Sequence, residues 1–145
     1  TNVPGIFAAG DVAESKNLYG EYLLNFTWYS AIEQGWVAGC NMIGEERRLI
    51  HSVCVNVLKG LHFVAAAISQ MPPSLDDCEV LTNEIQRQDI FEKIVLKNGQ
   101  IIQYQGVNVS RDKIGFMHQA IKTGRNMEKY KNQLFSPTFG AACML

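Results

Sequence analysis

Apolar positions in the first third of the chain change from a short continuous run to a helical period. Residues 6–9 form an apolar run that ends at Gly10-Asp11, which predicts a fully buried strand followed by a tight turn. The polar segment 15–22 is typical of a surface loop. Recurrence of apolar and small residues then predicts an amphipathic helix over 28–43 that ends at Gly44. Its expected inner face consists of Trp28, Ala31, Ile32, Gly35, Ala38, Gly39, Met42 and Ile43.

Two glycines lie inside this predicted helix, at Gly35 and Gly39. Glycine in a helix interior costs about 1 kcal/mol relative to alanine, so both positions call for an explanation. They indicate either the close approach of a sheet or ligand, or tight packing alone.

The pattern changes after the charged cluster 45–48. Valines alternating with other residues at 53, 55 and 57 predict a strand with one buried face. The apolar segment 61–68 fits a buried strand, with a short buried helix as the alternative, and the sequence Met71-Pro72-Pro73-Ser74 ends it.

The clearest local signal is a β-hairpin. Two β-prone runs, 89–97 and 100–109, are separated by Asn98-Gly99, which supplies the positive φ angles of a type I′ turn. Ser110 can then cap a helix that runs to about Thr123 and ends at Gly124. The inner stripe of this helix is expected to be Ile114, Met117 and Ile121.

These elements predict two parts, 1–46 and 47–145. One strand and one helix cannot bury both faces of a sheet, so the first part is expected to belong to something larger. The second part is long enough for a compact α+β unit with its own core.

Composition narrows the class of protein. The 145 residues are 47% hydrophobic and 19% charged, which is typical of a globular chain, and the net charge of -1 argues against nucleic-acid binding as the main role. No apolar run approaches the roughly 20 residues needed to cross a bilayer, and no secretory leader opens the chain. The four scattered cysteines form no Cys-x-x-Cys, and with three histidines they give no metal site; free thiols favour a cytoplasmic location.

Asp11 is the first residue with candidate chemistry. It follows the predicted strand at its carboxyl end, where open α/β sheets bind ligands, and a carboxylate there can accept hydrogen bonds from polyol hydroxyls. A Gly-Asp pair in such a place is also often only a turn. The nucleophile sets, paired acids and phosphate loops of hydrolases and kinases are not recognisable, so no catalytic residue is assigned.

Two motifs occur in order along the first part of the chain. They are Thr1-x-Val3-Pro4-Gly5-Ile6-Phe7-Ala8-Ala9-Gly10-Asp11-Val12 and Trp28-x-x-Ala31-x-x-Gln34-Gly35-x-x-Ala38-Gly39-x-Asn41-Met42-x-Gly44. The first resembles the second flavin-binding motif of the FAD-dependent pyridine nucleotide-disulfide oxidoreductases, and the second resembles the helix that follows it in that family. The fold class implied is an α/β remnant of an FAD-binding domain (strand-loop-helix), followed by an α+β C-terminal interface domain with a β-hairpin and a following helix.

The resemblance assigns cofactor-binding roles. Asp11 matches the aspartate that holds the ribityl chain of FAD, and the backbone after it matches the segment near the pyrophosphate and ribityl part. The helix start would point toward the O2 edge of the isoalloxazine ring, where its dipole stabilises negative charge on reduced flavin. The implied cofactor-binding residues are Gly10, Asp11, Val12, Ala13, Thr27 and Trp28.

The second part resembles, more loosely, the C-terminal domain of NAD(P)H-dependent rubredoxin reductases and nitrite reductase large subunits. The resemblance rests on Phe91-x-Lys93-Ile94-Val95-Leu96-Lys97-Asn98-Gly99 and on Gly106-x-x-x-Ser110 with its following helix. It implies a dimer interface, and hence a homodimer, or a surface that approaches the redox partner.

The sequence also departs from the family. No two glycines are separated by a single residue, so neither Gly-x-Gly-x-x-Gly turn for FAD or for NAD(P)H is present. We therefore expect a C-terminal fragment with half of a flavin site, inactive alone, from an enzyme that passes electrons from NAD(P)H through FAD to a protein or small acceptor. The alternative is a non-catalytic dimerisation or redox-partner docking module.

A basic cluster offers one candidate partner. Segment 111–131 holds six lysines and arginines against two acidic residues, a net charge of +4. Such a face could steer an acidic electron carrier such as rubredoxin, or it could be an ordinary solvated helix face.

Overall fold

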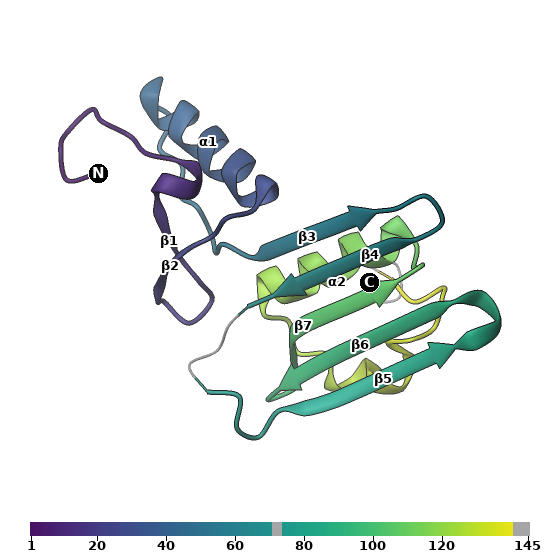
Figure 1. Ribbon diagram of the computed structural model, residues 1–145. Helices are drawn as coiled ribbons and strands as arrows, with labels where there is room; N and C mark the ends of the chain where they lie inside the picture. Colours follow the sequence, from purple (N-terminus) through teal and green to yellow (C-terminus); the bar gives the residue numbers. More distant parts are fainter. Residues whose placement is uncertain (71–73, 141–145) are drawn as a thin grey trace. The chain divides into compact units, whose positions relative to one another are not determined.

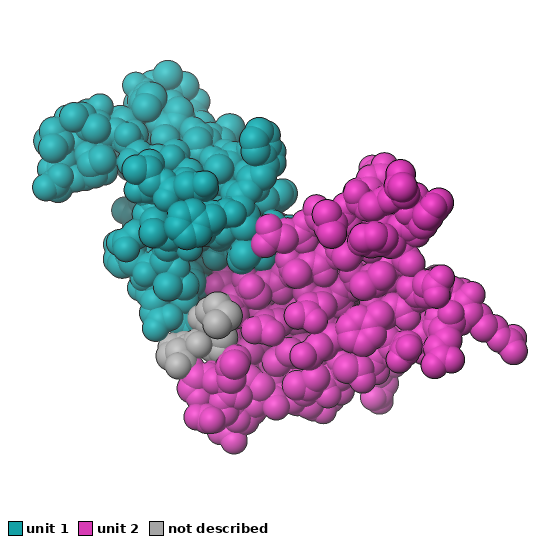
Figure 2. Space-filling view, viewed as in Figure 1, with its two compact units in different colours: residues 1–55 teal, residues 56–145 magenta. Residues whose placement is uncertain are grey.

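The computed structural model describes residues 1–70 and 74–140, and it divides into two compact units. The units are Thr1–Val55 and Asn56–Leu145 (Figure 2). The predicted boundary lies after Glu46 and the observed division lies after Val55. Each separates a short first part from a longer second part. Met71, Pro72 and Pro73 of the predicted break lie outside the described residues, as does Cys143.

The first unit contains a hairpin and one long helix. A 3-10 turn, η1 (Gly10–Val12), leads into the antiparallel strands β1 (Glu14–Lys16) and β2 (Tyr22–Leu24), which are followed by α1 (Trp28–Met42) (Figure 1). The predicted surface loop over 15–22 is therefore wrong at both ends, because Ser15 pairs with Leu23 and Lys16 pairs with Tyr22 in the hairpin. The Asn17 side chain closes the hairpin by accepting hydrogen bonds at 2.9 Å from the backbone N–H groups of Tyr19 and Glu21.

The predicted buried strand over 6–9 is wrong. Ile6 and Phe7 are 56% and 38% exposed, and none of the described strands pairs with this segment. A strand requires a hydrogen-bonded neighbour, so an apolar run without one is only extended chain. A turn precedes it, in which Ile6 N–H donates to Val3 O at 3.2 Å and Gly5 has φ +78°.

The helix predicted over 28–43 is confirmed, and its ends have local causes. Thr27 caps its start by accepting from Ser30 N–H at 3.4 Å. At its end, Gly44 has φ +84° and its N–H donates to Asn41 O, while Glu45 N–H donates to Cys40 O. This pair of bonds is a Schellman motif, which satisfies carbonyls that a helix end leaves without partners.

The predicted inner face of α1 is wrong. The buried residues of the helix are Ser30 and Gln34, whereas Trp28 is 83% and Ile43 75% exposed. Gly35 and Gly39 face open space, so neither marks a close approach within the described chain. Periodicity identifies the apolar face of a helix, but it does not say that the partner covering that face belongs to the same chain.

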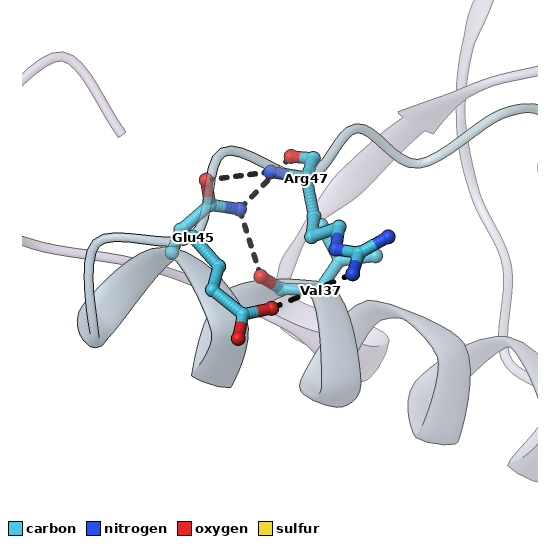
Figure 3. Close-up of polar contacts among 4 residues, drawn as sticks. Val37, Glu45 and Arg47 are labelled. Carbon is cyan, nitrogen blue, oxygen red and sulfur yellow. Dashed lines mark hydrogen bonds and ion pairs between the residues drawn. The ribbon is translucent and has the colours of Figure 1, made fainter.

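The charged cluster 45–48 after α1 is held against the helix by hydrogen bonds. The Asn41 side-chain amide donates to Val37 O at 2.7 Å and to Arg47 O at 3.0 Å, and its oxygen accepts from Arg47 N–H at 3.3 Å (Figure 3). Glu45 and Arg47 form an exposed ion pair at 3.5 Å. The chain leaving α1 therefore folds back along its last turn.

The second unit is a five-stranded sheet with one long helix. The strands are β3 (Cys54–Lys59), β4 (Val64–Ser69), β5 (Glu79–Ile85), β6 (Ile90–Lys97) and β7 (Gln100–Val107), in the spatial order β3-β4-β7-β6-β5. The predicted strand around Val55 is confirmed as β3, but its predicted buried face is wrong, because Val57 is 55% exposed and the last four residues of the strand are all exposed. The strand alternative for 61–68 is confirmed from Val64 onward. Short 3-10 turns, η2 (Gln86–Gln88) and η3 (Glu128–Gln133), complete the unit with α2 (Arg111–Thr123).

The hairpin and the second helix are confirmed closely. Asn98 and Gly99 have φ angles of +52° and +75°, and the pair joins β6 to β7 with Lys97 opposite Gln100. Ser110 caps α2 by accepting from Lys113 N–H at 3.2 Å, and Gly124 ends it at φ +59°.

Helix α2 and the segment after it lie against one face of the sheet (Figure 1). The apolar residues buried there include Ala66, Ile68, Ile94, Leu96, Ile101, Ile102, Tyr104, Ile114, Met117, Ala120, Ile121, Met127 and Leu134. Burial of this set gives the second unit a continuous core of its own.

The type I′ turn provides a test of the fold. Gly99→Ala should destabilise the chain by about 1–2 kcal/mol, because alanine is strained at positive φ and its Cβ would lie 2.6 Å from the Asn126 side chain. Urea denaturation measures the effect. Gly115→Ala in α2 is the control; no atom lies within 4 Å of its added Cβ, so it should stabilise by up to about 1 kcal/mol. Equal effects of the two substitutions would contradict this account.

Candidate functional site

The turn 10–13 is positioned by contacts with α1. Gly10 has φ +82°, and a Cβ added to it would lie 3.7 Å from the Ala31 Cβ, so the turn lies directly on the helix. Gly10 N–H donates to the Gln34 side-chain oxygen at 2.8 Å. Ala13 N–H closes the turn by donating to Gly10 O at 3.0 Å.

Five buried polar side chains extend this contact into a continuous network. Gln34 Nε2 donates to Ser30 Oγ at 3.0 Å, and Ser30 Oγ shares a hydrogen bond with Ser52 Oγ at 2.7 Å. Asn25 Nδ2 donates to Ser52 Oγ at 2.9 Å, and Thr27 Oγ1 donates to Asn25 Oδ1 at 3.0 Å. All five side chains are more than nine-tenths buried, so each bond replaces one that water would otherwise make.

The network fixes the turn against the first two turns of α1. It reaches from Gly10 through Gln34 and Ser30 to Thr27, the residue that caps the helix. Four of its members, Gln34, Ser30, Ser52 and Asn25, were not predicted as site residues. One signal was available, because the polar residues Ser30 and Gln34 are four apart and therefore share a helix face.

The predicted cofactor-binding residues fall into two groups. Asp11 and Val12 are exposed, Val12 by 81%, and the Asp11 carboxylate makes no hydrogen bond or ion pair with any described residue. Trp28, at the start of α1, is also exposed. Thr27 is 95% buried and its hydroxyl is engaged in the network, so it holds the helix end in place and presents no free hydroxyl.

These features fit part of a flavin site. A carboxylate whose lone pairs are not engaged by the protein can accept bonds from ribityl hydroxyls, and the start of a fifteen-residue helix favours negative charge nearby. The exposed indole of Trp28 adds an aromatic surface.

Similarity to known proteins is structural. No family model matches the sequence, and no curated protein matches it either. Among solved structures, a NAD-dependent persulfide reductase from A. fulgidus matches 88% of this chain at 22% identity and a TM-score of 0.68. An FAD-dependent pyridine nucleotide-disulphide oxidoreductase from Desulfovibrio vulgaris matches 91% at 18% identity and a TM-score of 0.73. A pyridine nucleotide-disulfide family oxidoreductase from Enterococcus faecalis V583 matches 97% at 19% identity and a TM-score of 0.72.

The chain has the fold of the C-terminal part of these oxidoreductases. It spans 27%, 35% and 37% of the three chains, about a third of their length. The predicted fold class, an α/β first part followed by an α+β unit with a hairpin and a helix, is confirmed.

Other kinds of site receive no support from the described residues. Across 1–70 and 74–140, no three histidine, cysteine or acidic side chains gather as metal ligands would. None of the helices in the same ranges has the length and apolarity needed to span a bilayer. Cys40, Cys54 and Cys78 form no disulfide among the described residues, and all three are half-buried.

The network predicts a local effect of removing its central amide. Gln34→Met leaves Gly10 N–H without a partner and removes one of the two hydrogen bonds of Ser30 Oγ, which should cost about 1–3 kcal/mol. Hydrogen exchange at the Gly10 amide, followed by NMR, should become at least about tenfold faster. Gln119→Met, on the exposed side of α2, is the control and should leave that amide unchanged. Unaltered exchange at Gly10 in Gln34→Met would show that the network does not hold the turn.

Proposed function

We propose that the chain is the C-terminal part of an FAD-dependent NAD(P)H oxidoreductase of the pyridine nucleotide-disulfide type. The observation that carries the proposal is the exposed Asp11 on a turn fastened to α1 through Gln34, in a chain whose fold matches such enzymes. The rubredoxin reductase or nitrite reductase large subunit type is the subgroup that the sequence motifs favour.

Each site residue has a distinct part in this proposal. Asp11 accepts hydrogen bonds from ribityl hydroxyls, while the backbone of Val12 and Ala13 follows the cofactor. The start of α1, capped by Thr27, directs its dipole toward negative charge on the flavin. Bound FAD supplies the redox chemistry, accepting electrons from the nicotinamide and passing them to a protein or small acceptor.

The outward apolar surface of the first unit supports its being part of a larger domain. Phe26, Trp28, Ile32, Trp36 and Met42 are between 55% and 83% exposed. Large exposed apolar patches normally mark contact surfaces. The matched structures are about three times as long as this chain, and a longer protein would supply both the cover for this surface and the other half of the flavin site.

Flavin binding tests the proposal directly. The chain should bind FAD weakly and saturably, as measured by quenching of flavin fluorescence. Asp11→Ala should weaken binding about tenfold or more, because a charged hydrogen-bond acceptor is lost. Glu46→Ala removes an exposed carboxylate from the same unit and should have no effect. Equal affinities of Asp11→Ala and the unaltered chain would contradict the role of Asp11, and NAD(P)H oxidation by the chain alone would contradict the half-site.

A second candidate function is a non-catalytic docking module. Among the described residues, no helix covers the sheet face of the second unit opposite α2 (Figure 1), and this face has a shallow hollow of about 280 Å³. Ala65, Ala67, Phe91 and Val107 line this hollow. A small apolar face of this kind suits an isologous contact with a second copy, and hence a homodimer.

An acidic carrier such as rubredoxin is the other proposed partner. Of the six cations in 111–131, Lys113 is buried and Lys131 is paired with Glu79 and Glu128. Of the other four, Arg111, Arg125 and Lys129 are exposed and Lys122 is half-exposed. This smaller set can still speed the encounter with an acidic protein in a salt-dependent way.

Sedimentation velocity distinguishes the two docking surfaces. The chain should form dimers with rising concentration, and Phe91→Asp should shift it to monomers by placing a charge in the hollow.

Binding of a rubredoxin added as probe should weaken with salt and with Lys122→Glu combined with Arg125→Glu. A monomer at every concentration would contradict the homodimer, and rubredoxin binding that ignores salt and charge reversal would contradict docking at this face.

A further inference from the structure

A buried acid and a buried base line a common cavity that opens at the surface of the second unit. Glu92 on β6 is 4% exposed and Lys113 on α2 is 5% exposed. Both line a cavity of about 120 Å³ that neither the flavin site nor the docking faces use. The apolar part of its wall consists of Ile85, Ile90, Val109, Phe135 and Pro137.

Each of the two charged groups is only partly satisfied by the protein. Glu92 accepts from the Tyr104 hydroxyl at 3.0 Å and, weakly, from Asn83 Nδ2 at 3.4 Å. Lys113 Nζ donates to Leu134 O and, at 3.2 Å, to Ser136 O. Lys113 Nζ also lies 5.9 Å from the centroid of the Phe139 ring. An ammonium has three donors and a carboxylate about four acceptor positions, so at most one donor and about two acceptor positions are not engaged in hydrogen bonds.

Glu92 and Lys113 interact electrostatically, although the described residues show no ion pair between them. Burial lowers the pKa of Lys113, and the nearby Glu92 carboxylate opposes this by raising it. Burial, and then the charge of Glu92, raise the pKa of the Tyr104 hydroxyl, which therefore stays protonated and donates. The cavity thus has a negative side and a positive side, and their charges sum to zero.

This charge arrangement selects its ligand. A ligand with a single net charge would leave one of the two buried ions without a ligand partner, which is costly. A zwitterion satisfies both sides, with an ammonium donating to Glu92 and a carboxylate accepting from Lys113. The carboxylate would also lie at the start of α2, because Ser110, the cap of that helix, lines the same cavity.

We propose that the cavity between Glu92 and Lys113 binds a small α-amino acid with a short apolar side chain. Its size supports a small ligand, since water needs only about 10–15 Å³ of such space and 120 Å³ therefore exceeds the room for one molecule several times. The five apolar side chains of the wall match the body of the ligand. Water alone is the competing occupant.

Titration of the full chain with L-alanine, followed by NMR, tests the site. Saturable shifts are expected for residues around Glu92 and Ser110. Propionate lacks the ammonium and ethylamine lacks the carboxylate, and each should bind at least about thirtyfold more weakly, because each leaves a buried charge unpaired. If L-alanine gives no saturable shift, or if all three compounds act alike, the proposal is overturned and water is the occupant.

Two variants keep the test independent of folding. Glu92→Gln should abolish the preference for L-alanine over propionate, whereas the matched control Glu84→Gln, on exposed β5, should retain it. Val109→Phe fills the cavity without removing a charge and should abolish L-alanine binding with the circular dichroism spectrum unchanged. L-alanine binding that persists in Val109→Phe would place the ligand elsewhere and overturn the proposal.

Discussion

The interior of the first unit depends on buried hydrogen bonds rather than on buried hydrocarbon. Gln34, Ser30 and Ser52 connect the Gly10 turn, the body of α1 and the chain that leaves the helix, and Asn25 and Thr27 extend this connection to the helix start. Hydrogen bonds are directional, and a buried polar group without a partner costs about 1–3 kcal/mol, so a network of this kind allows little sliding between the elements it joins. Apolar packing alone would have tolerated rotation of α1 about its own axis.

The second unit is built in the opposite way, around apolar side chains. Among its described residues the buried polar side chains are few: Gln70, His118 and the cluster of Glu92, Tyr104 and Lys113. Its sheet and α2 enclose a continuous apolar core, into which Glu92, Tyr104 and Lys113 are inserted. Lys113 has a structural task there, because it holds the segment around Leu134 and Ser136 against the helix. That task does not require Glu92 or a cavity beside it. The acid and the cavity are therefore the features that favour a ligand over a merely structural lysine.

An element of this fold could be predicted from the sequence when the residues that determine it are close together in the chain. The β6–β7 hairpin and α2 follow from two or three adjacent residues each, Asn98-Gly99 for the turn and Ser110 with Gly124 for the helix ends. The segment 6–9 and the buried face of α1 depend on which chain segments lie beside them, and no short pattern contains that information. The network illustrates the same limit, since Ser52 lies 22 residues from Ser30 and is separated from it by the end of the helix.

Asp11 was a candidate from its place in the sequence, but its assignment to flavin came only through resemblance, and the geometry explains why. Asp11 differs from any surface aspartate in its setting alone: it follows a glycine that needs a positive φ, and that glycine is fastened to a helix 24 residues away. The carboxylate itself makes no bond within the described chain, so nothing in the stability of the unit requires an acid there. A residue dispensable for folding, on a turn that the interior fixes in place, is the combination expected when the partner of a side chain is a ligand rather than the protein.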